Sequence, residues 1–475
     1  EVSQGQNGSF KATLSRSKRQ MVPRASWLWP LALATSQQDC PPDAPSGLRF
    51  VRPAAHVHPP ARRLTLFCER KTSMQLRAMK TTMRAVSTMR AGASGTRTRE
   101  RASRTPRASS STSSSTSSAA ASSDAARGEY AWRGHVVRYE RRGDAGTATR
   151  HVVLLPGFGV GSFHYDSLSA RLGRDESTCV WALDFCGQGA SWPASDEASR
   201  DGSLDGFAYS VDAWRDQVVD FARTVVRAED GVYLAGNSLG GFVATYAAAT
   251  EESALVKGLI LMNATPFWAF VPSDRESLVY KLTPWRGELP APSWIRSPVK
   301  AYWESFRSEK NVRGLLGLVY ANKERLDDAL VRQIIEPTDN ANALCTFCSV
   351  VWSPKAKMSF DDMLRRIGER EKELPVALVY GKEDPWVVPL WGQRLKRALP
   401  HADYYELSPA GHCPAHECPS TTSEIMRSWM RYVETTRANG DPPPSGSTDG
   451  VATLVDGSPR NIFERIDACR AARAA

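Results

Sequence analysis

Short apolar runs alternate with helical stretches along most of the chain after about residue 150. Six runs of four or five mostly apolar residues predict buried strands, at residues 152–155, 180–183, 232–235, 259–262, 376–380 and 404–407. Residues 239–249 are Ala-rich and predict a helix. Continuous apolar strands separated by helices are typical of parallel sheets that are covered on both faces. The pattern therefore predicts an α/β fold with a mostly parallel sheet and helices on both faces.

A long insertion separates the fourth and fifth predicted strands. Residues 263–372 are helical in pattern and rich in aromatic side chains. We expect an inserted helical lid over the carboxyl edge of the sheet, where open α/β sheets bind ligands. Further on, the string GDPPP at residues 440–444 begins a polar segment. We therefore predict a folded domain at residues 128–437 and a disordered tail at residues 438–475.

The first 127 residues are rich in Arg, Ser, Thr and Ala and poor in acidic residues. They contain 21 Lys and Arg against 6 Asp and Glu, whereas the remainder contains 40 against 45. The net charge of +10 is therefore confined to a leader, which argues against a nucleic-acid-binding domain. Such leaders are typical of organelle transit peptides, and a disordered segment without targeting function is the alternative. The sequence contains no run of 18 apolar residues, so it predicts no membrane-spanning helix.

A possible nucleophile lies between the third predicted strand and the helix that follows it. The string GNSLG at residues 236–240 is a G-x-S-x-G motif, in which glycines allow a sharp turn that projects the Ser hydroxyl. The pentapeptide alone is a weak signal, but its strand–turn–helix context is the one that the motif requires. We expect Ser238 to be a nucleophile, and the alternative is a structural turn.

A Ser hydroxyl needs a base to accept its proton, and the base needs a carboxylate to orient it. Asp384 follows the fifth predicted strand and His412 follows the sixth, in the chain order that the motif predicts. Both would lie at the sheet edge that carries Ser238. Glu383 is the alternative acid and His416 is the alternative base.

The negative charge that develops on the substrate oxygen needs N–H donors, which form an oxyanion hole. One donor is expected to be the backbone N–H of Leu239, directly after the nucleophile. The second should come from the loop after the first strand, where the N–H of Phe158 is the best candidate. The alternative is that residues 156–159 form a plain glycine turn.

Several longer strings resemble the pheophytinases, plastid α/β-hydrolases that cleave the phytyl ester of magnesium-free chlorophyll. The strings are LPGFGVGSFHY (155–165), SVDAWRDQVVDF (210–221), GNSLGG (236–241), NATPFW (263–268), GKEDPWVVPLWG (381–392) and SPAGHCP (408–414). The resemblance covers about residues 129–434. It implies an α/β-hydrolase fold with Ser238 as nucleophile, Asp384 as acid and His412 as base. Ala415, His416 and Cys186 depart from the usual family pattern.

The resemblance implies a serine esterase that converts pheophytin to pheophorbide and phytol in the chloroplast stroma. Substrate contacts are then expected from Phe163, His164, Phe267 and Trp268. We also expect peripheral contact with the thylakoid membrane or with other enzymes of chlorophyll breakdown. We do not expect the protein to bind nucleic acid. The alternatives are a chlorophyll dephytylase, another plastid carboxylesterase or lipase, and a non-catalytic binding protein.

No cofactor or metal is implied by the sequence. No glycine-rich phosphate loop or dinucleotide motif precedes a helix. Cys345 and Cys348 form a C-x-x-C motif, but no second pair lies nearby at the spacing that a zinc site needs. We therefore expect these two thiols to pack inside a lid helix.

Overall fold

The computed structural model describes residues 125–192, 203–204, 207–251, 254–266, 291–370, 374–440 and 442–455. The predicted leader lies outside these residues except for its last three positions, and so do Phe267 and Trp268. The first strand begins at Ala126, two residues before the predicted start of the domain.

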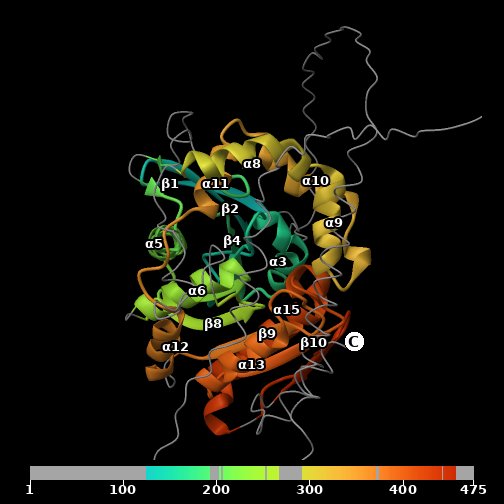
Figure 1. Cartoon of the computed structure of the whole chain (residues 1–475). Coiled ribbons are helices and arrows are strands. Elements are labelled where there is room, and N and C mark those ends of the chain that lie inside the picture. Colours follow the sequence, from blue (N-terminus) through green and yellow to red (C-terminus); the bar gives the residue numbers. More distant parts are fainter. Residues whose placement is uncertain are drawn as a thin grey trace, which may run out of the picture. The chain divides into compact units, whose positions relative to one another are not determined.

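A ten-stranded sheet forms the centre of the described structure (Figure 1). Its strands lie in the spatial order β1 (Ala126–Trp132), β2 (His135–Arg142), β4 (Thr178–Leu183), β3 (Arg150–Leu155), β7 (Val232–Asn237), β8 (Val256–Met262), β9 (Val376–Gly381), β10 (Asp403–Ser408), β12 (Val451–Leu454) and β11 (Gly446–Ser447). The strands from β4 to β10 are parallel, and antiparallel strands extend the sheet at both ends. A separate hairpin joins β5 (Ser203–Leu204) to β6 (Phe207–Ala208). The predicted mostly parallel sheet is thereby confirmed.

Helices cover both faces of this sheet. Alternate side chains of β3 point to opposite faces, so Val153 packs in one apolar cluster and Val152 in the other. The first cluster includes residues of α5 (Val211–Phe221), α6 (Leu239–Thr250), α12 (Phe360–Glu369) and α13 (Pro389–Ala398). The second includes residues of α3 (Asp166–Leu172) and α15 (Pro419–Thr435). Two short helical segments, η3 (Ala222–Val226) and η6 (Arg437–Asn439), follow α5 and α15.

The strand register brings four carboxyl ends to one edge of the sheet. Leu155 of β3 pairs with Gly236 of β7, which also pairs with Leu261 of β8. Met262 of β8 then pairs with Val379 of β9. Loops that follow these strands therefore begin at the same level, and this edge carries the predicted nucleophile.

The insertion after β8 forms a group of helices that contact one another. These are α8 (Ser293–Phe306), α9 (Glu309–Val319), α10 (Asp328–Ile335) and α11 (Ala343–Val351), with the short helices η4 (Lys323–Arg325) and η5 (Glu336–Asp339). Figure 1 shows them in yellow and light orange, gathered beyond the sheet. We refer to residues 291–351 as the lid.

The last helix of the predicted insertion, α12, packs against the sheet and is not part of the lid. One face of α12 is apolar and buried in the first apolar cluster. This face carries Phe360, Met363 and Ile367. The ring of Phe360 stacks on Phe242 of α6 with 5.6 Å between centroids. The expected lid boundary near residue 372 therefore moves to a point before Phe360.

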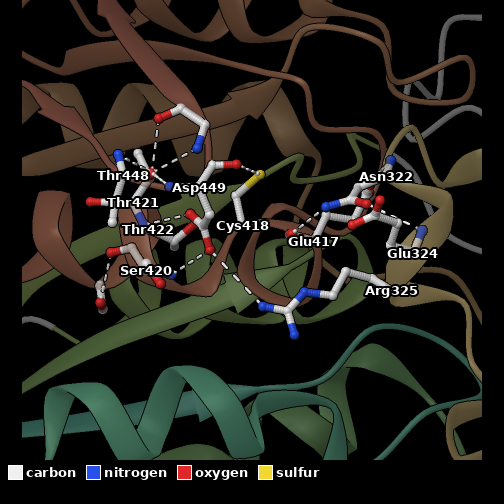
Figure 2. Close-up of polar contacts among 12 residues, drawn as sticks. Asn322, Glu324, Arg325, Glu417, Cys418, Ser420, Thr421, Thr422, Thr448 and Asp449 are labelled. Atoms are coloured by element: carbon white, nitrogen blue, oxygen red, sulfur yellow. Dashed lines mark hydrogen bonds and ion pairs between the residues drawn. The ribbon is translucent and has the colours of Figure 1, made fainter.

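The prediction of a disordered tail is wrong for residues 442–455. β12 pairs antiparallel with β10, and Ala452 of β12 is buried in the second apolar cluster. Asp449 accepts hydrogen bonds from the backbone N–H groups of Ser420 (2.9 Å) and Thr421 (2.8 Å) at the start of α15 (Figure 2). A four-residue strand is too short to form alone, so its composition could not reveal a strand that depends on β10. Residues 456–475 lie outside the described structure.

No helix in the described ranges combines the length and the apolar character that a membrane span requires.

Candidate active site

Ser238 occupies a sharp turn between β7 and α6. Its backbone has φ 53° and ψ −116°, a conformation that costs a non-glycine residue roughly 1–3 kcal/mol. The surrounding glycines allow this turn to form. A Cβ on Gly240 would lie 2.0 Å from the carbonyl oxygen of Leu155, and one on Gly236 would lie 2.3 Å from Gly240. The N–H of Ser238 also donates to Met262 (3.0 Å), so the neighbouring strand supports the turn.

Asp384 and His412 form a buried pair at the same edge of the sheet. The Nδ1 atom of His412 lies 2.7 Å from Oδ2 of Asp384. Asp384 also accepts hydrogen bonds from the side-chain amide of Asn263 (2.7 Å) and from the backbone N–H of Trp386 (2.7 Å). These donors satisfy a carboxylate that is only 3% exposed. With Nδ1 directed at Asp384, the Nε2 atom of His412 is left to exchange a proton with another group.

The two alternatives from the sequence make different contacts. Glu383 accepts hydrogen bonds from the hydroxyl of Ser408 (2.6 Å) and the N–H of Ala410 (2.8 Å). His416 stacks on His164 with 4.7 Å between ring centroids. Burial lowers the pKa of His416 to about 4, with nearby Arg325 adding to this effect.

The environment of His412 favours its protonated form. Burial by itself would lower the pKa of His412, but attraction to Asp384, their hydrogen bond and the charge of Glu417 together raise it above its ordinary value. An imidazole in this environment can accept a proton and is stabilised once charged, as a general base requires.

Asn237 connects the turn of Ser238 to the loop of His412. Its side-chain amide donates to the carbonyl oxygens of His412 (2.8 Å) and Met262 (3.0 Å). Its backbone N–H donates to the hydroxyl of Tyr165 (3.1 Å), which belongs to the short helix η2 (Ser162–Tyr165). From the sequence, Asn237 is only a variable position of the motif, and its role is not predicted. The one feature that could have indicated it is a polar side chain at the end of a buried strand.

The loop after β3 lies against Ser238. A Cβ on Gly157 would lie 3.6 Å from the Cβ of Ser238. The next glycine, Gly159, donates its N–H to the side chain of Gln188 at 2.6 Å, which orients the loop around Phe158. Leu239 begins α6, so its N–H belongs to the first turn, where backbone donors have no intrahelical partner.

An open apolar pocket lies between this loop and the lid. Its lining residues are Phe158, Gly159, Val160, Phe163, Gly187, Gln188, Gly189, Trp192, Trp303, Ile334, Pro337, Thr338, Ala343, Phe347 and Val350. Phe158 and Phe347 contact each other across it, with 5.8 Å between ring centroids. The pocket therefore combines the predicted oxyanion loop with aromatic side chains of the lid.

Phe163 lines this pocket, whereas His164 does not. His164 is 3% exposed, and its Nε2 atom lies 2.8 Å from the hydroxyl of Tyr320 at the end of α9. Burial lowers the pKa of His164 well below its ordinary value. Its geometry is that of a neutral hydrogen-bonding residue between the sheet edge and the lid, and its contact with substrate stays a prediction.

The C-x-x-C cysteines lie in α11 as expected. Cys348 is buried, and burial raises the pKa of its thiol to about 12. Within the described ranges no group of three His, Cys, Asp or Glu side chains has a metal-binding arrangement.

Comparisons with known proteins agree with this architecture. Residues 152–424 match the family model described as alpha/beta hydrolase family. The chain is also 38% identical over 319 residues to "Pheophytinase, chloroplastic" of Arabidopsis thaliana. That alignment covers 63% of this chain and 64% of the relative, so the chain spans less than two thirds of the relative's length.

Solved structures with a similar arrangement have low sequence identity to this chain. One is a serine hydrolase involved in carbazole degradation, the CarC enzyme, with 17% identity and a TM-score of 0.47, covering 65% of this chain and 99% of that chain. Another is a bacterial membrane phospholipase A with 20% identity and a TM-score of 0.44, covering 66% of this chain and 88% of that chain. The match to the family model spans more than half of the chain. Together with the sheet order and the turn at Ser238, it establishes that the chain belongs to the alpha/beta hydrolase family.

Proposed function

We propose that this hydrolase is a serine esterase that converts pheophytin to pheophorbide and phytol. The observation that carries the proposal is the buried pair of Asp384 and His412, which Asn237 joins to the turn of Ser238. The 38% identity to a chloroplast pheophytinase supports the choice of substrate.

In the proposed reaction, Ser238 Oγ attacks the carbonyl carbon of the phytyl ester while His412 Nε2 takes the hydroxyl proton. The N–H groups of Leu239 and Phe158 stabilise the oxyanion. His412 then gives its proton to the departing phytol oxygen, which leaves an acyl-enzyme on Ser238. Water attacks this ester while His412 takes a proton from the water, and His412 then returns the proton to Ser238 Oγ as the acyl–oxygen bond breaks and pheophorbide is released. Asp384 keeps the imidazole oriented and stabilises its charged form.

The pocket beside Phe158 suits an apolar substrate. Most of its lining is apolar, and its aromatic residues from the loop and lid can stack on a flat macrocycle with roughly 0.5–1.5 kcal/mol per ring pair beyond burial. A central Mg²⁺ prefers oxygen ligands, and an apolar lining offers few of them. We therefore expect the metal-free ring to be favoured over chlorophyll.

We further propose that the protein acts in the chloroplast. The relative is described as chloroplastic, and the basic, Ser-rich leader has the composition of a transit peptide. An apolar substrate with a phytyl chain resides in membranes, so access to it requires transient contact with the thylakoid surface.

A substrate panel tests the proposal. The full chain and its Ser238→Ala variant would be assayed on pheophytin a, chlorophyll a and a short p-nitrophenyl ester, with pheophorbide, chlorophyllide and p-nitrophenol measured. We expect pheophytin to have the highest kcat/KM, and Ser238→Ala to lose at least about 10³-fold of it. Equal efficiency on chlorophyll would overturn the selectivity. Full activity in Ser238→Ala would overturn the mechanism, and no turnover of any ester would favour a binding protein.

A further inference from the structure

Glu417 is a fully buried carboxylate beside the loop that carries His412. It ends the short helix α14 (Pro414–Glu417) and is 0% exposed. Its Oε1 atom accepts hydrogen bonds from the N–H of Gly411 at 3.0 Å and the N–H of Cys413 at 3.1 Å. These are the two residues that flank His412, so one carboxylate oxygen contacts the backbone on both sides of it.

The other oxygen of Glu417 contacts the lid. Oε2 accepts hydrogen bonds from the N–H of Ala321 (2.7 Å) and the N–H of Asn322 (3.0 Å), in the turn between α9 and η4. Figure 2 shows the Glu417 side chain next to Asn322. The N–H of His412 itself donates to the carbonyl oxygen of Val319 at the end of α9 (2.9 Å). The Glu417 carboxylate thus binds two N–H groups of the lid and two of the His412 loop, and the N–H of His412 joins the lid directly.

Burial raises the pKa of Glu417 above its ordinary value, and the four backbone N–H groups oppose this effect by favouring the ionised carboxylate. A buried carboxylate is unfavourable unless it is fully hydrogen-bonded, and here each oxygen accepts two N–H groups. A Gln at this position would offer only one acceptor oxygen. Its NH₂ group would face the other two N–H groups, and donors cannot hydrogen-bond to one another. The four donors are backbone N–H groups, so they are present whatever residue stands at position 417. An apolar residue there would leave all four without this acceptor.

The ionisable groups around His412 come from several elements. Asp384 faces it from the loop after β9, and Glu417 faces it from α14. His164 lies near it on η2, and burial keeps the pKa of His164 well below its ordinary value. Burial also raises the pKa of the adjacent Cys413 thiol, with Glu417 adding to the effect. The charged neighbours of His412 in this set are thus Asp384 and Glu417.

We propose that Glu417 is a positioning residue for the esterase reaction proposed above, on which this inference rests. It fixes the backbone on both sides of His412 and couples the His412 loop to the lid turn at residues 321–322. Two physical effects follow. The backbone that carries the imidazole is held in place, and a displacement of about 1 Å in a reacting group can cost about 10²-fold in rate. The second negative charge also favours the imidazolium that forms during the reaction.

Glu417→Gln tests both effects, and Glu383→Gln is the matched control. Glu383 also uses its carboxylate to bind this region, through Ser408 and Ala410, but it does not bind the residues that flank His412. In the full chain we expect Glu417→Gln to lower kcat about 10- to 100-fold with little change in KM. Its acid limb of kcat/KM should move to lower pH, because a negative charge that raises the pKa of His412 has been removed. The control should keep its acid limb in place.

A second readout does not depend on turnover. The chain has 8 His residues, so ¹⁵N-labelled histidine would give a small set of NMR signals, and His412→Gln would identify that of His412. We expect the pKa of His412 to fall in Glu417→Gln and to stay unchanged in Glu383→Gln. This titration applies even if the ester is not the one proposed.

The outcomes separate the two proposals. If the wild-type chain shows no Ser238-dependent ester hydrolysis, the proposed function fails, and the His412 titration still decides the role of Glu417. If Glu417→Gln lowers the melting temperature but leaves the kcat and the pKa of His412 unchanged, Glu417 is only structural and the positioning role is overturned.

Discussion

At the scale of single residues, the candidate site depends on polar side chains that orient the groups expected to react. Asn263 is fully buried directly after β8, and its two amide atoms contact different partners. Nδ2 donates to Asp384 (2.7 Å), and Oδ1 accepts the N–H of Gly381 (2.8 Å). The position of the carboxylate that faces His412 is thus determined by a residue 121 positions earlier in the chain.

We expect Asn263→Ala to lower kcat about tenfold to a hundredfold. A hydrogen bond to a charged group contributes about 1.5–3 kcal/mol, and its loss leaves Asp384 less firmly held. Steady-state kinetics on the p-nitrophenyl ester would measure this, with circular dichroism as a check of folding. A kcat within about twofold of the wild type would show that Trp386 and His412 are enough to orient Asp384.

The pH dependence of kcat/KM should report the raised pKa of His412. The general base must be neutral, so activity falls about tenfold per pH unit below its pKa. Because Asp384 and Glu417 raise that pKa, the acid limb should lie above the ordinary value for His of about 6.5. Asp384→Asn removes the larger of the two raising effects and should move the limb to lower pH. A wild-type midpoint below about 6.5 would contradict the assignment.

At the scale of elements, the turn between β7 and α6 depends on the close approach of backbone segments. Gly240 is the second glycine of the motif, and the carbonyl oxygen of Leu155 occupies the space that its Cβ would need. This contact joins α6 directly to β3, the strand that also leads into the predicted oxyanion loop. The glycine thus serves the packing of two elements as well as the turn.

Gly240→Ala should destabilise the fold by several kcal/mol, because the added methyl group would lie 2.0 Å from a backbone oxygen that cannot move freely. Gly314→Ala in α9 is the matched control, since a Cβ there meets no atom within 4 Å. Ala in a helix interior is favoured over Gly by roughly 0.5–1 kcal/mol, so the control should be neutral or stabilising. Thermal unfolding of both variants would measure this, and equal melting temperatures would contradict the packing argument.

At the scale of the whole molecule, the end of the described chain completes the sheet and contacts the lid. β12 covers the edge of β10, Asp449 caps α15, and Arg325 of η4 lies 4.0 Å from Asp449 (Figure 2). The cap is the stronger of these contacts, since exposed ion pairs contribute little. The C-terminal segment therefore supports α15, the second helix after His412.

A chain that ends at Gly440 should be less stable than one that ends at Val455. Loss of the cap and of the pairing with β10 removes roughly 2 kcal/mol or more, which corresponds to a fall of several degrees in melting temperature. The uncovered edge of β10 should also increase aggregation. Calorimetry and light scattering would compare the two chains, and identical behaviour would show that β12 adds nothing to the sheet.

The sequence by itself determined the alternation of strands and helices, the turn around Ser238 and the placement of Asp384 and His412 after consecutive strands. These features are local, because they follow from apolar periodicity, from glycine sterics and from the position of a residue at a strand end. Tertiary structure decided which groups meet. It directs Asp384 rather than Glu383 at His412, places His164 against Tyr320, and adds β12 to a sheet edge. Glu417 joins segments 96 residues apart, and no local pattern encodes such a contact because its energy comes from backbone groups that only the folded chain brings together.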